Sequence, residues 1–124
     1  MALDFHSQED TFCELDDYIA YCEIEPTSLQ YLDSFEPGEY DKLAVWVDLC
    51  NSQGMKVGHF YEDTVLRQCQ LPQALTNLWQ CYGHIAQRPS FYHHGERHRD
   101  VYVRMVWILQ KAIEQQRGLI AFCD

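Results

Sequence analysis

Hydrophobic side chains recur at helical spacing in the second half of the chain. Between residues 71 and 85 they follow one another at intervals of four, three, four and three positions: Leu71, Leu75, Leu78, Tyr82 and Ile85. This spacing predicts one apolar helix face, and Pro72 is a favourable first residue for such a helix. A further helix is predicted over residues 96–117, with Gly118 as its stop and with these inward positions: Val101, Met105, Ile108, Leu109 and Ala112. The two repeats favour packing of helix on helix.

The acidic segment between Ser7 and Pro26 is also predicted to be helical. Ser7 is a favourable N-cap and Pro26 a stop, so a helix is expected between them. Its inward face is expected to hold Phe12, Leu15, Ile19 and Cys22, with Tyr18 at the edge. Its outward face is expected to hold Asp10, Glu14, Asp17 and Tyr21.

The middle of the chain gives weaker patterns. Residues 27–35 suggest a short helix capped by Thr27 or Ser28, and residues 36–41 a turn. Residues 43–50 fit both a helix and an alternating strand; the length of the segment 40–54 and its final glycine favour a helix. Residues 55–61 are predicted as an extended segment or loop, 62–70 as the start of a helix, 87–95 as a loop, and 119–124 as a tail that packs back. The resulting expectation is a mainly α, compact single domain over 1–124, a bundle of about four to six helices with a short extended segment near 55–61.

Charge is distributed unevenly along the chain. Twelve carboxylates and no lysine or arginine fall in residues 1–41, which gives −12; residues 42–124 hold seven carboxylates and nine bases, which gives +2 and a total of −10. A protein with this charge is repelled by phosphates, so direct binding of nucleic acid is not expected. Four arginines near the final helix are expected instead to pair with some of the N-terminal acids: Arg88, Arg97, Arg99 and Arg104.

Targeting signals and catalytic motifs are not recognised. Asp4 falls where a secretory leader would be basic or apolar, and no apolar run is long enough to cross a bilayer, so a cytoplasmic protein without membrane contact is expected. Six cysteines without CxxC spacing are expected to be reduced, buried hydrophobes: Cys13, Cys22, Cys50, Cys69, Cys81 and Cys123.

A histidine-rich stretch is the most reactive-looking part of the chain. His93, His94, His98, Glu96 and Asp100 offer metal ligands within eight residues. His94 and His98 are four apart, but the glycine between them suggests a junction between loop and helix, which favours a solvated segment over a metal site. No metal, cofactor or catalytic residue is predicted, and the chain is not expected to be an enzyme.

The acidic third is the predicted functional surface. Like charges at helical spacing and acids near a helix C-terminus cost stability, which hints that the negative field is selected. We expect it to bind a protein that has a basic nucleic-acid-binding surface and to inhibit or regulate that protein, as a DNA mimic or anti-defence protein would. The predicted partner-binding residues are Glu9, Asp10, Glu14, Asp16, Asp17, Tyr21, Glu23, Glu25, Asp33, Glu36 and Glu39. Two alternatives remain open: an adaptor or assembly subunit that binds through apolar helix faces, and a metal protein or enzyme built on His93, His94, His98 and a cysteine. The sequence leaves the partner's identity and the oligomeric state open.

Overall fold

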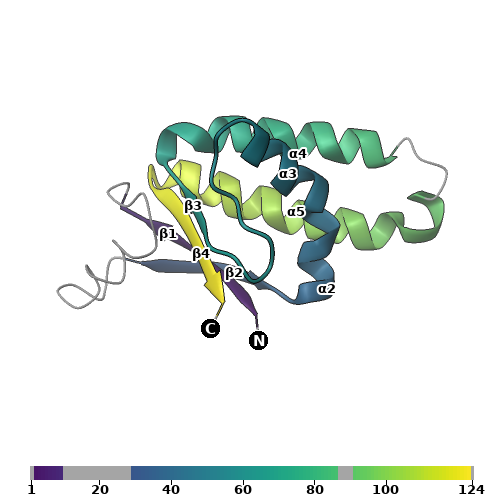
Figure 1. The fold of residues 1–124 in the computed structure, drawn as a ribbon, viewed down its shortest axis with the longest axis horizontal. Coiled ribbons are helices and arrows are strands. Elements are labelled where there is room, and N and C mark those ends of the chain that lie inside the picture. Colours follow the sequence, from purple (N-terminus) through teal and green to yellow (C-terminus); the bar gives the residue numbers. More distant parts are fainter. Residues whose placement is uncertain (1, 10–28, 87–90, 124) are drawn as a thin grey trace.

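A four-stranded antiparallel sheet underlies the structure (Figure 1). The computed structural model of the chain describes residues 2–9, 29–86 and 91–123. The sheet has the order β2-β1-β4-β3. These strands are β2 (Gln30–Phe35), β1 (Leu3–Gln8), β4 (Gly118–Cys123) and β3 (Thr64–Leu66). The first and last described segments therefore lie side by side in the middle of the sheet, with Leu3 opposite Cys123.

This sheet overturns the predicted helical bundle. Ser7 is a buried residue of β1 and not a helix cap, and residues 30–35 form a strand where a short helix was predicted. Residues 64–66 are a strand and not the start of a helix, and the predicted tail is β4. Each strand has six residues or fewer, so the alternation of inward and outward side chains repeats too few times to compete with a helical reading. The predicted helix faces between residues 10 and 26 lie outside the described residues.

Helices supply the second layer (Figure 1). A single turn, α2 (Pro37–Tyr40), and a 3-10 turn, η1 (Asp41–Leu43), lead into α3 (Ala44–Ser52). A second 3-10 turn, η2 (Gln68–Gln70), precedes α4 (Leu71–Ala86), and α5 (Phe91–Glu114) runs beside α4. Helix was therefore the correct choice for residues 44–52, and Gly54 after it has a positive φ of 86°. The predicted apolar seam of residues 71–85 is also confirmed as α4.

Helix α5 differs from its prediction at both ends. It begins at Phe91, so Gly95 lies inside the helix and not at a junction with a loop. It ends at Glu114, before Gly118, which is the first residue of β4. The reversal between them uses Gln116, whose φ is 55°, and the Arg117 N–H donates to the Ala112 carbonyl at 3.1 Å. A left-handed residue two positions after a helix is a usual way to end it, and here that residue is a glutamine.

The core lies between the sheet and the helices. Strands β1 and β4 point alternate side chains toward α5, which is why these strands and the helix share one buried cluster: Leu3, Phe5, Met105, Ile108, Leu119 and Ala121. Trp46 of α3 is fully buried and donates from Nε1 to the Ala74 carbonyl of α4 at 2.9 Å, which fixes these two helices against each other. Among the described residues, no helix is long and apolar enough to cross a membrane.

Candidate protein-binding surfaces

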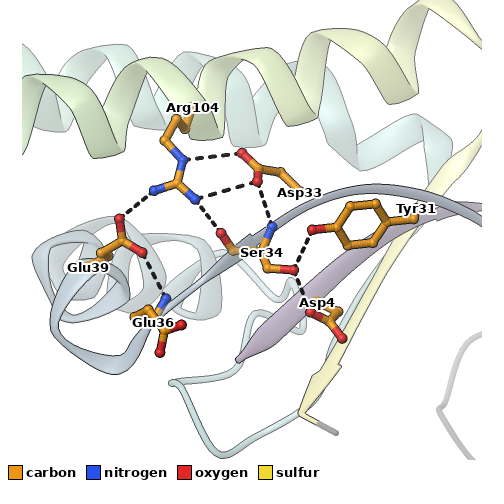
Figure 2. A network of polar contacts seen from close by, with 7 residues as sticks. All are labelled: Asp4, Tyr31, Asp33, Ser34, Glu36, Glu39 and Arg104. Carbon is orange, nitrogen blue, oxygen red and sulfur yellow. Dashed lines mark hydrogen bonds and ion pairs between the residues drawn. The ribbon is translucent and has the colours of Figure 1, made fainter. Parts of the chain in front are cut away.

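Arg104 joins three elements through one partly buried polar network (Figure 2). From α5, its Nε donates to the Asp33 carboxylate of β2 at 3.2 Å and its Nη1 to the Glu39 carboxylate of α2 at 2.5 Å. Its Nη2 donates to the Ser34 carbonyl. The guanidinium carbon also lies 4.6 Å from the centre of the Phe35 ring, in cation–π contact. The expected pairing of this arginine with N-terminal acids is confirmed.

Two of the predicted partner-binding acids thus stabilise the fold. Asp33 and Glu39 share one guanidinium, which offsets part of their charge. The Glu36 N–H donates to Glu39 at 2.9 Å, and this bond together with Arg104 holds the pKa of the Glu39 carboxyl below its usual range although burial opposes the shift. Glu36 and Glu9 are exposed, whereas the other predicted acids and Tyr21 lie outside the described residues.

An exposed acidic surface is formed by α3, the 3-10 turn before it and the loop after it. It consists of four exposed residues, Asp41, Asp48, Tyr61 and Glu62, with the partly buried Asp63, and is called the acidic surface below. Asp41 is exposed in the 3-10 turn that leads into α3, and Asp48 is exposed in the middle of α3 itself. The loop reaches this side because His59 Nε2 lies 3.3 Å from the Asp48 carboxylate. The segment 36–63 holds six carboxylates and two lysines, a formal charge of −4.

The loop that carries Tyr61 is fixed by hydrogen bonds to its base. The Asn51 side chain donates to the Val57 carbonyl at 2.6 Å and accepts from the Val57 N–H at 3.1 Å. The Tyr40 hydroxyl donates to the Gly58 carbonyl at 2.7 Å, and the Gly58 N–H donates to Thr64 Oγ1 at 2.9 Å. These contacts hold the loop in one conformation, so its exposed side chains are presented from a rigid base.

A polar cleft lies within this loop. It has a volume of about 490 Å³, and Asn51, Lys56, His59, Glu62 and Asp63 contribute to its lining. Tyr61, next in sequence to the lining residue Glu62, is 76% exposed and stands edge-on to the Phe60 ring, with the ring centres 4.9 Å apart. A large exposed aromatic side chain on a fixed loop is typical of an anchor in a protein interface.

A second surface lies on α4 and α5 and is apolar. A groove of about 240 Å³ between the two helices is lined by residues that include Trp79, Tyr82, Arg99, Val103 and Val106. Trp79 is 52% exposed and Val103 is 55% exposed. The sixteen residues of α4 include no Asp, Glu, Lys or Arg, although eight of them are exposed. Depletion of charge with exposed tryptophan and arginine is the composition of an interface core.

The cysteines and histidines form no reactive centre among the described residues. Burial raises the pKa of the Cys50 thiol to about 11, the opposite of what a thiolate nucleophile needs. Cys50 and Cys81 are buried, as predicted, whereas Cys69 is exposed. No three His, Cys, Asp or Glu side chains in the described part of the chain are grouped to hold a metal ion. His93 and His94 lie within α5, and their side chains are outside the described set.

Sequence reasoning named the residues of neither surface, although it left open an adaptor that binds through apolar helix faces. It placed the acidic site before residue 42, whereas Asp48, Glu62 and Asp63 follow it. A usable signal was present for the apolar face: an uncharged stretch from residue 71 to 86, with its tryptophan outside the predicted inward positions. The acidic surface gave no such signal, because the contact between His59 and α3 is set by the fold.

No family model, curated protein or solved structure matches this chain. The narrower expectations of an inhibitor, a DNA mimic and an anti-defence protein gain no support from these comparisons or from the structure.

Proposed function

We propose that this chain is a non-enzymatic binding protein whose acidic surface docks on a basic surface of a partner protein, of the kind that proteins use to bind nucleic acid. The observation that carries the proposal is a 76% exposed tyrosine followed by two carboxylates on a loop that is held by hydrogen bonds between side chains and backbone. Charge alone gives fast but weak association, and Tyr61 supplies the apolar contact that holds the complex.

The cleft adds a specific contact to this general attraction. Glu62 and Asp63 contribute carboxylates to its lining, and its volume of about 490 Å³ admits a lysine or arginine side chain. A guanidinium would be able to form two parallel bonds with a carboxylate there. The net charge of −10 steers a basic partner toward the chain at long range.

The test is a capture experiment from the native host with nuclease-treated lysate, so that nucleic acid cannot bridge the proteins. The double variant Asp41→Asn with Asp48→Asn raises net charge by two and removes two carboxylates of the acidic surface. The matched control, Asp100→Lys on α5, raises net charge by the same amount elsewhere. Tyr61→Ala tests the anchor.

We expect wild type and Asp100→Lys to capture the same basic protein. The double variant and Tyr61→Ala should not capture it. With that partner purified, the double variant should raise Kd by about tenfold and flatten its salt dependence, because each rim charge is worth a few tenths of a kcal/mol to about 1 kcal/mol. A partner that binds the double variant and wild type equally at two salt concentrations would refute the proposal.

A further inference from the structure

The exposed side of α5 carries an ordered stripe of side chains. Its members follow at intervals of four, four, three and four residues and therefore share one side of the helix: Arg99, Val103, Trp107, Gln110 and Glu114. All five are exposed, and Trp107 is 46% exposed. The stripe begins with a cation, has apolar residues in its middle and ends with an anion.

This stripe continues into the groove beside α4. Arg99 and Val103 belong to both, and Trp79 of α4 stands on the far wall. The resulting face has two half-exposed tryptophans in a part of the surface where α4 contributes no charged side chain. Apolar area of this kind favours association, since contiguous exposed patches are uncommon on monomers.

We propose that the face formed by the α5 stripe and the groove binds a second copy of this chain. The midpoint between residues 99 and 114 falls at 106.5, beside Trp107. A twofold axis at that point runs the two α5 helices antiparallel and sets Arg99 against the partner's Glu114. By the same count, Val103 faces the partner's Gln110, and Trp107 lies near the partner's Trp107. An isologous interface of this kind needs a self-complementary surface, and a stripe with opposite charges at its two ends is one.

The charges of the stripe permit a second copy at this face although the chain as a whole is acidic. Two copies with net charge −10 repel each other, but the stripe itself is neutral, with one arginine and one glutamate. Repulsion from the remaining acids is screened beyond about 8 Å at physiological ionic strength. Glu114 is free to reach across, because its contact with Lys111 is long at 3.9 Å and its side chain is 70% exposed. The dimer does not depend on the acidic surface, which lies on α3 and its loop.

Sedimentation velocity over a concentration series tests the proposal. Wild type should approach a species of twice 14.7 kDa as concentration rises. Arg99→Glu alone and Glu114→Arg alone should each raise the dimer Kd about tenfold or more, because each places two like-charge pairs in the interface. The double variant restores both pairs with reversed sign and should return Kd to within about threefold of wild type.

Two valine variants supply a matched control. Val103→Asp puts a carboxylate in the middle of the stripe and should give a monomer. Val45→Asp, at a similarly exposed valine on α3, should leave the dimer intact. Circular dichroism and thermal melts establish that all variants are folded. Any of three results would overturn the proposal: wild type that stays monomeric at every concentration, a double charge swap that does not restore association, or two valine variants that behave alike. The first result would leave the face available for a different protein.

Discussion

The guanidinium of Arg104 on α5 lies 2.5 Å from the carboxylate of Glu39 on α2, a residue 65 positions earlier in the chain. The same guanidinium reaches Asp33 of β2, so one side chain ties an edge strand and a helical turn to the longest helix. The turn it holds leads directly into Asp41 and α3. The position of the acidic surface therefore depends on an arginine that is not part of it.

Replacing Arg104 with methionine should lower the free energy of unfolding by about 1–3 kcal/mol. The value lies below that for a fully buried ion pair, because the arginine and aspartate side chains are about one-third exposed. Arg104→Lys should recover only part of this lost stability, since one ammonium group cannot donate hydrogen bonds to Asp33, Glu39 and the Ser34 carbonyl at the same time. Urea unfolding of the three proteins gives the comparison. A lysine variant as stable as wild type would show that charge alone accounts for the network.

Substitution of Gly58 should destabilise the protein more than substitution of an exposed glycine in a helix. A Cβ atom there would lie 2.6 Å from the Asp63 carbonyl oxygen, so Gly58→Ala forces the loop apart. We expect a loss of about 1–3 kcal/mol, as for other overpacked sites. Gly83→Ala in α4 is the control: nothing lies within 4 Å of its added Cβ, and alanine should stabilise that helix by about 0.5–1 kcal/mol. Thermal melts of both variants measure the two effects. Equal changes in melting temperature would contradict the close contact at Gly58.

The Tyr40 hydroxyl should stabilise the loop through its bond to Gly58. Tyr40 is buried, so Tyr40→Phe leaves the Gly58 carbonyl without this donor and should cost about 1–3 kcal/mol. Burial also raises the pKa of the Tyr40 hydroxyl well above its usual value, so the bond should persist through moderately alkaline pH. Hydrogen exchange should show faster exchange of the Gly58 and Val57 amides in the variant. Unchanged exchange rates would mean that Asn51 and Thr64 suffice to hold the loop.

Acidification should destabilise the sheet through His6. Burial lowers the pKa of His6, against the attraction of Asp4, and its ring stacks on Phe122 with centres 5.2 Å apart. The unfolded chain therefore binds a proton more readily than the folded one. The free energy of unfolding should keep its full value above the pKa of His6 in the unfolded chain, about 6.5. It should fall as the pH decreases from there toward the lower pKa of His6 in the folded protein. Melting temperatures at pH 7.5 and 5.5 should differ less in His6→Phe than in wild type, whereas exposed His84→Asn should behave as wild type does. An unchanged pH response in His6→Phe would contradict this assignment.

The helices could be predicted from sequence and the sheet could not, for a physical reason. Helix α4 repeats its apolar face over four turns, and every neighbour that defines this face is at most four residues away. Strand β1 has six residues, and its two neighbouring strands start 22 or more residues later in the chain. Asp33 and Glu39 were predicted to be partner-binding residues for the same reason, because the arginine that binds them is 71 and 65 positions away.

The last described strand, β4, occupies the middle of the sheet between β1 and β3. Residues 118–123 are synthesised long after β1, so β1 waits for its partner β4. Until then, among the described strands, β1 is able to pair only with β2, and β3 has no neighbour other than β4. Folding that depends on such distant pairing is slow and exposes strand edges while synthesis proceeds. Removal of residues 118–123 would therefore split the sheet into two separate pieces, and a tag that interferes with this strand would affect folding of the entire chain.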